Sequence, residues 1–389
     1  MIKTEKWEKV FLGEIADEII ERIDNPSQSG FELFVGLEHF ISGDLKIEQW
    51  GSTKNLVSAM KKFQKGDILF ARRNAYLKRS SIVQFDGVCF GDAFVIREKK
   101  DSLVPGFLAF IFNSESLWNY ANSYAAGTMS KRVKWRDLAK YSFKLPPLNE
   151  QKRLADLLWS VDGAVEKQLF LLRELKQLFR IIVEEKLIFL KGKKIQLSGI
   201  ADDSTGGFID GDWIESKDQS EEGIRLLQLA DIGVGTFLDK SRRFITEETF
   251  HRLSCFEVLP GDILLARMPE PLGRACIIPN IGCKMITAVD CCVIRVNEKM
   301  HNKHFWMYFL NSDFMRRKME SLASGTTRKR ISRKNLERIQ ICCPGKKDQD
   351  RIVRNLARLT KNMDKVLINI ALQKQIRKQL INQIFGGKS

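Results

Sequence analysis

Two loops rich in arginine and lysine contain the residue types that could bind the phosphates of a nucleic acid. One follows the Gly127-Thr128 pair and the other follows the Gly325-Thr326 pair. Glycine lets backbone amides approach a phosphate closely, threonine adds a hydroxyl donor, and the cations displace condensed counterions. A solvated charge run before a short helix is the alternative, but recurrence in both halves of the chain favours binding. The residues predicted to bind are Thr128, Lys131, Arg132 and Lys134 in the first loop and Thr326, Arg328, Lys329 and Arg330 in the second.

Arginines at the ends of two predicted strands form a second group of candidates. Arg72, with Arg73 after it, ends one strand, and Arg267 ends the matching strand in the other half. An arginine at a strand end can donate two hydrogen bonds to a base edge, or it can pair with a carboxylate of its own domain. Both alternatives remain open from the sequence, and the repeated Asp92 and Asp290 are predicted to bind backbone or arginine. Further candidates are Tyr76, Lys78, Arg79 and the Arg242-Arg243 pair.

No pattern typical of a catalytic site accompanies these loops. The chain has no Asn-Pro-Pro-aromatic motif of adenine methylation, no glycine-rich cofactor loop after a strand and no repeated acid–lysine cluster of a nuclease. The ending 386–389 resembles a phosphate loop, but Asn382 stands where that loop needs glycine. His301 and His304 fit a surface position better than a metal site, and the eight cysteines lack the spacing of zinc ligands. We therefore expect no cofactor or metal in this chain and no catalysis by it.

The elements that position these residues occur twice. Lys65-Gly66-Asp67-Ile68-Leu69-Phe70-Ala71-Arg72 returns as Pro260-Gly261-Asp262-Ile263-Leu264-Leu265-Ala266-Arg267, and the segment 107–114 returns as 305–312. The offset between the copies grows along the chain, which indicates two copies of one domain with insertions in the second. Between these anchors the copies barely match. Such a pattern suits a molecule that reads two different things with one geometry.

Each copy is predicted to be a mixed α+β domain, with domain 1 at residues 1–148 and domain 2 at residues 192–345. The Gly-Asp turns each begin a strand, and a final strand runs into a proline in each copy. The predicted strands are 68–71, 81–85, 88–97 and 141–145 in domain 1, and 263–266, 274–279, 288–296 and 338–342 in domain 2. One amphipathic helix is predicted in each domain, over 106–120 and 303–320.

Two long helices are predicted after the two domains, over 149–191 and 346–389. Apolar residues recur mostly at steps of three and four, with Gln168 interrupting the first helix and a longer step after Ile370 in the second, which indicates heptad seams. The seam residues are Leu154, Leu158, Val161, Val165, Leu172, Leu175, Phe179 and Ile182 in the first helix, and Ile352, Leu356, Leu359, Met363, Val366, Ile370, Ile376, Leu380 and Ile384 in the second. Each seam is too long for one domain to cover, so we expect an antiparallel coiled coil that joins two domains as a pseudo-two-fold dumbbell.

The overall composition agrees with a partner of opposite charge. The formal net charge is +16 and the isoelectric point is about 9.4, which points to a polyanion such as nucleic acid. A basic protein without any nucleic-acid role is the alternative. No signal peptide and no apolar run long enough for a membrane helix occur. Cysteines in apolar runs read as buried reduced thiols, so we expect a cytoplasmic protein that contacts no membrane.

The junction Leu145-Pro146-Pro147-Leu148-Asn149-Glu150-Gln151-Lys152-Arg153-Leu154 resembles the motif that joins a target recognition domain to a conserved helix in specificity subunits of type I restriction-modification systems. The resemblance covers nearly the whole chain, including both Gly-Asp-Ile-Leu strands, both basic loops and both helices. The second copy departs from the motif, with Asp348 in place of glutamate and Gly345 in place of the second proline, although Pro344, Gln349 and Arg351 remain.

This resemblance implies a non-catalytic DNA-binding subunit. Each domain would read one half of a split, asymmetric site in double-stranded DNA, and the coiled coil would set the spacer between the halves. The helices and domains would dock two methyltransferase subunits, which bind S-adenosylmethionine, and restriction subunits that use ATP and magnesium would join them. Apolar residues away from the seam, such as Leu157, Phe170 and Leu171, could bind partner helices.

Two other functions remain possible from the sequence. A fused nuclease–methylase fragment would require a catalytic motif that the chain lacks, and cofactor binding by the isolated chain would reveal it. A structural or regulatory coiled-coil protein would bind DNA without discriminating between sequences. The target bases themselves are not encoded in any pattern that we can interpret, because base readout depends on a few side chains in divergent loops.

Overall fold

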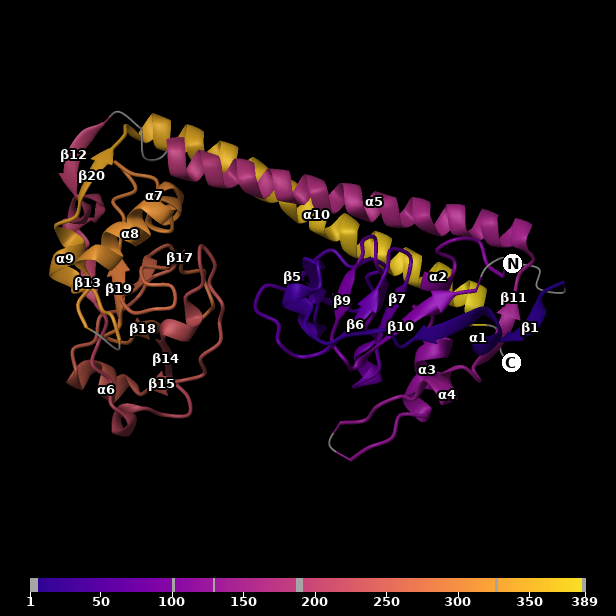
Figure 1. The fold of residues 1–389 in the computed structure, drawn as a ribbon. Coiled ribbons are helices and arrows are strands. Elements are labelled where there is room, and N and C mark those ends of the chain that lie inside the picture. The colour runs from indigo at the N-terminus through magenta and orange to yellow at the C-terminus, as the bar shows by residue number, and fades with distance from the viewer. Residues whose placement is uncertain (1–5, 100–101, 129, 187–191, 326–327, 387–389) are drawn as a thin grey trace. The chain divides into compact units, whose positions relative to one another are not determined.

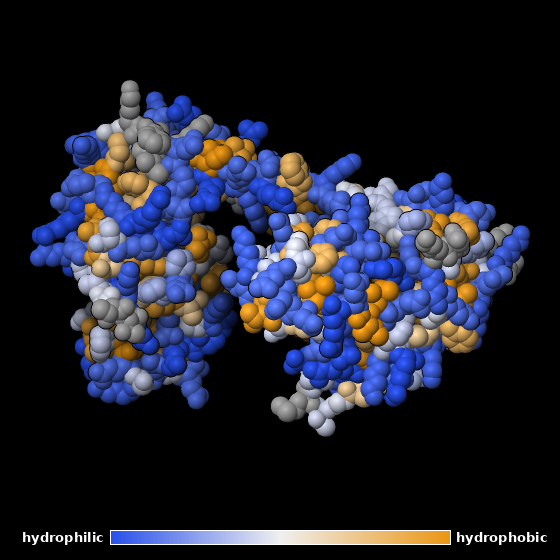
Figure 2. All heavy atoms as spheres, viewed as in Figure 1, coloured by the Kyte–Doolittle hydropathy of each residue, from blue (hydrophilic) through white to orange (hydrophobic). Residues whose placement is uncertain are grey.

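The protein is described by a computed structural model that covers residues 6–99, 102–128, 130–186, 192–325 and 328–386. It consists of two compact units (Figure 1). Unit 1 contains residues 1–171 and 365–389, and unit 2 contains residues 172–364. Each unit therefore combines one α+β domain with parts of both long helices. Figure 2 shows that the visible face of each domain is largely hydrophilic, with scattered apolar patches.

Domain 1 is built on a four-stranded sheet with the order β2-β10-β7-β8. A five-stranded sheet with the order β3-β6-β9-β4-β5 and a β1-β11 pair complete it. The strands are β1 (Glu8–Phe11), β2 (Ala16–Ile19), β3 (Arg22–Ile23), β4 (Leu33–Val35), β5 (Gly51–Ser52), β6 (Met60–Phe63), β7 (Ile68–Ala71), β8 (Ser80–Ile82), β9 (Gly87–Cys89), β10 (Ala93–Glu98) and β11 (Ser142–Leu145). The helices of this domain are α1 (Leu12–Ile15), α2 (Leu108–Ile111), α3 (Glu115–Ser123) and α4 (Trp135–Leu138).

Domain 2 repeats this sheet with the order β13-β19-β16-β17, and it repeats the closing pair as β12-β20. Its remaining sheet has three strands in the order β15-β14-β18. The strands are β12 (Lys193–Gln196), β13 (Phe208–Asp210), β14 (Ile224–Leu227), β15 (Phe244–Ile245), β16 (Ile263–Ala266), β17 (Ala275–Ile277), β18 (Met285–Thr287), β19 (Cys291–Ile294) and β20 (Gln340–Cys343). The helices are α6 (Glu247–Arg252), α7 (Lys303–Leu310), α8 (Asp313–Leu322) and α9 (Arg333–Glu337).

The strands that follow the two Gly-Asp turns lie in the middle of each repeated sheet. Both β7 and β16 have the predicted bounds, and every residue of both strands is buried. Asp67 holds the turn before β7 by accepting from the Gln64 backbone at 2.8 Å, and it binds Arg97 of β10 through two hydrogen bonds of 2.7 and 2.8 Å. Domain 2 repeats this arrangement with Asp262 and Arg295. Each buried aspartate is thus both a turn cap and half of an ion pair.

Two predicted strands are wrong because each includes a turn, which divides the first and shortens the second at its start. Residues 88–97 form the end of β9 and most of β10, which belong to different sheets, and residues 288–296 begin just after β18 and contain β19. The turns are closed by Ala93 donating to the Phe90 carbonyl at 3.1 Å and by Cys291 donating to the Ala288 carbonyl at 2.9 Å. A continuous apolar run can therefore serve two sheets when a turn lies inside it.

The single amphipathic helix predicted in each domain is also wrong, because an Asn-Ser pair divides it. Ser114 caps α3 by accepting from the Leu117 backbone at 3.4 Å, and Ser312 caps α8 by accepting from Met315 at 3.2 Å. Asn311 exchanges hydrogen bonds of 3.0 and 2.8 Å with the backbone of Ala275 in β17. The repeated Asn-Ser pair thus fastens a strand and begins a new helix.

The long helices are α5 (Leu148–Ile181), which continues as a π-helical turn (Ile182–Lys186), and α10 (Lys346–Phe385). A buried glutamine joins each helix to its own domain. Gln151 accepts from the Val104 backbone at 3.0 Å and donates to the Pro146 carbonyl at 2.9 Å. Gln349 makes the same pair of bonds with Asn302 and Pro344, at 2.8 and 2.9 Å. The Pro-to-Gln spacing of the junction motif therefore satisfies backbone groups on both sides of the junction.

The seam predicted for the second helix is wrong at one position. Ile376 is 40% exposed, whereas Arg377 beside it is 3% exposed. The alternation of three and four steps continues from Ile370 through Gln373 and Arg377 to Leu380, so polar residues occupy two seam positions. Among the described residues, no helix is long and apolar enough to cross a membrane.

Candidate nucleic-acid interface

The basic loop of domain 1 is a narrow hairpin closed by two backbone hydrogen bonds. Ala126 donates to the Arg132 carbonyl at 3.1 Å, and Arg132 donates to the Ala126 carbonyl at 2.9 Å. Gly127 has a φ of 128°, and a Cβ there would meet the Ser130 carbonyl oxygen at 3.1 Å. Glycine is needed at this position because an L side chain is strained in that conformation. Buried Val133 then anchors the hairpin by donating to the Arg72 carbonyl at 2.9 Å.

Domain 2 repeats this hairpin with other residues. Ser324 donates to the Arg330 carbonyl at 3.0 Å, and Arg330 donates back at 2.8 Å. Gly325 has a φ of 104°, and a Cβ there would meet the Arg328 carbonyl oxygen at 2.6 Å. Buried Ile331 donates to the Arg267 carbonyl at 3.1 Å. The two loops are thus closed by the same backbone bonds, which the repeated Gly-Thr pairs alone did not establish.

An aspartate orients one arginine of each hairpin. Asp92 accepts two hydrogen bonds from Arg132, at 3.0 and 3.1 Å, and one of 3.4 Å from Arg72. These bonds, above all those from Arg132, lower the pKa of Asp92 below its ordinary value. Asp290 lies 3.2 Å from Arg330 in domain 2. The prediction that the repeated aspartates bind backbone or arginine is confirmed, and their partner is arginine.

Cations without an internal partner project from both hairpins. Lys131, Lys134, Arg328 and Lys329 are exposed, and none has an ion pair within the part of the chain that the structure describes. Thr128 is exposed too, whereas Thr326 lies outside the described residues. Arg132 and Arg330 keep about two-fifths of their side chains exposed despite their ion pairs, at 42% and 40%. Such unpaired cations on a fixed hairpin are suited to phosphate contacts.

The structure corrects the expectation that Arg267 contacts DNA. Its side chain is 5% exposed and lies 3.0 Å from Asp210 of β13, and its guanidinium also donates to the Val289 carbonyl. The side chain therefore takes the second alternative that the sequence left open, a pair with a carboxylate of its own domain. Arg72 also has a carboxylate partner, because it lies 3.4 Å from Asp92, and its side chain is 32% exposed.

The turn after β7 belongs to this interface more closely than the sequence indicates. Arg73 is exposed and donates to the Ser130 hydroxyl at 2.5 Å, and Asn74 donates to the Lys131 carbonyl at 2.9 Å. Tyr76, in the same turn, is 64% exposed. Among the other weak candidates, Lys78 pairs with Glu115, Arg242 pairs with Asp239 at 2.9 Å, and Arg243 donates to the Gln219 side chain. Exposure on a turn that is bonded to the hairpin, which the sequence could not supply, makes Tyr76 a candidate contact.

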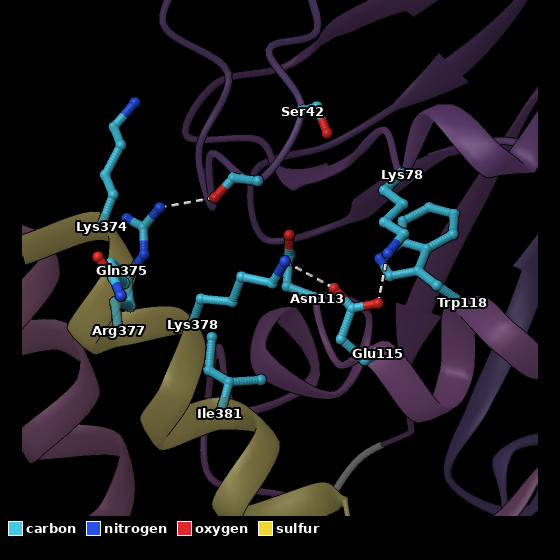
Figure 3. Close-up of a pocket in the computed structure, with 11 residues that line it drawn as sticks. Ser42, Lys78, Asn113, Glu115, Trp118, Lys374, Gln375, Arg377, Lys378 and Ile381 are labelled. Atoms are coloured by element: carbon cyan, nitrogen blue, oxygen red, sulfur yellow. Dashed lines mark hydrogen bonds and ion pairs between the residues drawn. The ribbon is translucent and has the colours of Figure 1, made fainter. Parts of the chain in front are cut away.

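A cavity of about 290 Å³ lies in unit 1 between domain 1 and the end of α10 (Figure 3). Glu115 lies in its wall between Lys78 and Lys378, and it is 2.8 Å from the latter. Lys374 reaches Asp44 at 2.6 Å, and Arg377 donates to the Gly43 carbonyl at 2.6 Å. These cations are neutralised or bonded inside the unit, so the cavity belongs to the packing of domain against helix. The described residues contain no group of ligands that could hold a metal ion.

Comparison with known proteins places this arrangement in a family. The family model for the type I restriction modification DNA specificity domain matches the chain twice, over residues 4–177 and 170–380. The MjaVIII specificity subunit of a type I restriction enzyme from Methanocaldococcus jannaschii is 24% identical over 75% of this chain and 72% of its own length. The EcoDI specificity subunit from Escherichia coli is 24% identical over 42% of this chain and 37% of its own length.

Solved structures share the fold over nearly the full length. A chain from a study of complex assembly and conformational transition in a type I restriction-modification system superposes with a TM-score of 0.63 at 20% identity, covering 99% of both chains. The HsdS subunit from Thermoanaerobacter tengcongensis gives a TM-score of 0.51 at 21% identity, covering 98% of this chain and 97% of its own. Because the family model matches both halves of the sequence, the chain belongs to the type I restriction-modification DNA specificity family.

Proposed function

We propose that each of the two domains reads one half of a split DNA site, so that the chain supplies the sequence specificity of a type I restriction-modification complex. The observation that carries this proposal is the repeated hairpin, with the same closing bonds and exposed cations in both domains. Phosphate contacts from Lys131 and Lys134, and from Arg328 and Lys329, would fix each domain on the duplex. The candidate contacts also include Thr128, Thr326, Arg132, Arg330, Arg73 and Arg72.

The two half-sites should differ in sequence. The scaffold is common to both domains, but the structure around it is not, since domain 1 has a five-stranded second sheet where domain 2 has three strands. Base readout depends on side chains that enter the groove, and these come from segments that differ between the copies. An asymmetric bipartite site follows from this difference.

The two long helices are proposed to pair as an antiparallel coiled coil that separates the domains and sets the spacer, which would give a pseudo-two-fold dumbbell. In unit 1 the beginning of α5 shares a core with the end of α10, through residues such as Leu158 and Ile384. In unit 2 the end of α5 shares a core with the beginning of α10, through Phe179 and Ile352. This order of contacts supports an antiparallel pair. Helices of this length span about 50–60 Å.

Methyltransferase subunits are the proposed partners of the helices. Large apolar side chains remain exposed outside the helix cores, and surfaces of this kind mark interaction sites. They include Leu157, Phe170, Leu171 and Leu178 on α5, and Leu367, Ile368 and Leu372 on α10. We propose that two methyltransferase subunits bind there and supply S-adenosylmethionine chemistry, and that restriction subunits add ATP- and magnesium-dependent chemistry in the cytoplasm. This chain itself would remain non-catalytic.

Selection from random DNA would test this function. The purified complex of the chain with its methyltransferase subunit is incubated with random-sequence duplexes, and bound DNA is recovered and sequenced after several rounds. The proposal predicts enrichment of two different short half-sites at a fixed spacing. Recovery of DNA without any common sequence would contradict it and would favour a structural coiled-coil protein.

A further inference from the structure

The turn beside each basic hairpin has the same length and closure in both domains. It spans residues 72–79 between β7 and β8 and residues 267–274 between β16 and β17. The closing bonds join the same positions in both copies, from Ala71 to the Arg79 carbonyl and from Ala266 to the Arg274 carbonyl, each at 2.9 Å. Lys78 and Gly273 occupy matching positions, and both have left-handed backbones, with φ of 51° and 79°. The two turns thus share their length and their ends, whereas their middles differ, since Ala75–Leu77 form a 3-10 turn in domain 1 and Gly273 donates to the Ala266 carbonyl at 2.9 Å in domain 2.

This turn lies against the proposed phosphate-binding hairpin in both domains. In domain 1, Asn74 and Arg73 bond directly to Lys131 and Ser130 of the hairpin. In domain 2, Ile331 bonds to the carbonyl of Arg267, the first residue of the turn. If the hairpins contact the DNA backbone, the turns are the neighbouring segments that can reach base edges. The inference below therefore rests on the proposed function.

The turn in domain 2 presents an unusual group for a basic surface. Glu270 is exposed and has neither an ion pair nor a hydrogen bond within the described part of the chain. Arg274 holds the backbone on both sides of Glu270, since it donates to the Met268 carbonyl at 3.3 Å and the Pro271 carbonyl at 3.1 Å. It also donates to the Ile232 carbonyl at 2.7 Å. The matching residue in domain 1 is Ala75, which is buried. The carboxylate is thus a specific feature of domain 2 on a fastened turn.

The Glu270 carboxylate cannot bind a phosphate, because two negative charges repel each other and an ionised carboxylate can only accept hydrogen bonds. A base edge in the major groove offers a donor in the exocyclic amine of cytosine or adenine. The adenine amine stands beside the N7 acceptor of the same base, which would repel the carboxylate, whereas cytosine carries no acceptor of its own in the major groove. We propose that Glu270 is a specificity-determining residue of domain 2 that accepts a hydrogen bond from the N4 amine of a cytosine.

Methylation mapping of three versions of the chain tests this proposal. The wild type, Glu270→Ala and Glu270→Gln are each expressed with the methyltransferase subunit, and modified bases are mapped in the host DNA. Glu248→Gln on α6 is the matched control, because Glu248 is also exposed and has no described partner. Circular dichroism confirms that each variant is folded.

The proposal predicts a change at one base pair of one half-site. Glu270→Ala should reduce the preference for C·G at that position by about 10-fold or more, and Glu270→Gln should shift it toward adenine, which glutamine can contact through N6 and N7. The other half-site and the spacer should stay as in the wild type and the control. An unchanged motif in both variants would overturn the proposal, as would complete loss of methylation by a folded variant. Absence of any motif in the wild type would instead refute the proposed function.

Discussion

Asp162 of α5 and Arg377 of α10 form an ion pair in which both side chains are almost completely buried, at 5% and 4% exposure. Lys46 lies 3.4 Å from the same aspartate, and Arg377 also donates to the Gly43 carbonyl at 2.6 Å. Burial raises the pKa of Asp162, against the opposing effect of Arg377 and Lys46. A buried pair of this kind favours one alignment of two helices, because any shift in register leaves a charge without its partner.

Replacing one member of this pair should destabilise the protein strongly. Arg377→Met leaves a buried carboxylate with only Lys46 beside it, and we expect a loss of about 3 kcal/mol in the free energy of unfolding. The double variant Asp162→Leu with Arg377→Met should recover most of this loss. Urea unfolding followed by circular dichroism measures both, with Arg173→Met on the exposed face of α5 as control. Equal stability of Arg377→Met and the wild type would contradict the buried pair.

The junction glutamines should matter equally in the two copies. Gln151→Ala and Gln349→Ala each leave the backbone N–H of Val104 or Asn302 without its partner, and we expect each to cost about 1–3 kcal/mol. Gln177→Ala, at an exposed position of α5, should change stability by less than about 0.5 kcal/mol. Thermal unfolding of the four proteins makes this comparison. A small effect at one junction only would show that the repeated motif is not equivalent in the two domains.

Removing a hairpin cation should change the salt dependence of DNA binding. If Lys131 contacts a phosphate, Lys131→Ala should lower the slope of log affinity against log salt by about 1, with the target sequence unchanged. Binding of the complex to its site is measured by fluorescence anisotropy at several salt concentrations. Lys144→Ala on β11 serves as the control, because its side chain is exposed and unpaired among the described residues. An identical slope for Lys131→Ala and the wild type would argue against a phosphate contact.

The coiled-coil proposal predicts a shorter spacer after a matched deletion. Counting in opposite directions from Asp162 and Arg377, residues 170–176 of α5 should face residues 363–369 of α10. Deleting both heptads shortens the pair by about 10 Å, which corresponds to about 3 base pairs. Selection of bound DNA should return both half-sites unchanged at the smaller spacing. A changed half-site, or an unchanged spacing, would be inconsistent with helices that set the distance.

The stability of domain 2 should depend on pH through Asp212. Burial raises the pKa of this carboxyl to about 6, above its ordinary value of 3.8. The folded state therefore holds the proton more tightly than the unfolded state does. The stabilising contribution of Asp212 to the free energy of unfolding is fully present below pH 4 and is lost as the pH rises through 6. Asp212→Asn should stabilise the protein on the order of 1 kcal/mol at pH 7.5 and little at pH 4.5.

Thermal unfolding at the two pH values gives the comparison. Asparagine keeps an oxygen for the Phe256 backbone donor, which lies 3.2 Å from Asp212. Asp364→Asn on the exposed surface of α10 should show no such difference between the two pH values. A stabilisation of equal size at both pH values would mean that the ionisation of Asp212 is not its cause.

The repeated anchors made the two-domain organisation predictable, because identical motifs in two places require the same local structure. The strands after the Gly-Asp turns, the long helices and the pairing of Asp92 and Asp290 with arginine all follow from those anchors. The divided helices were missed because Ser114 and Ser312 act as caps only when a new helix begins there. The spacing of the apolar residues continues across such a break, so it does not reveal that one helix ends and another begins.

The candidate interface was predictable only in part. Exposed Lys131 and Lys329 agree with a solvated basic loop, but Arg267 is buried because its guanidinium pairs with Asp210 of β13 and binds the Val289 carbonyl, contacts that the sequence does not reveal. Ile376 was placed in the seam because it is apolar, although the heptad count passes through Arg377. A single glutamate belongs to no sequence pattern, so the sequence does not distinguish Glu270 from other glutamates. Its position on the turn beside the hairpin does.

Mapping of modified bases in cellular DNA tests the central claim most directly. Cells that express this chain with its methyltransferase subunit are compared with cells that lack only this chain. We expect a split, asymmetric motif with a methylated adenine on each strand, present only when the chain is expressed. The same methylation pattern in both cultures would contradict the assignment of sequence specificity to this protein.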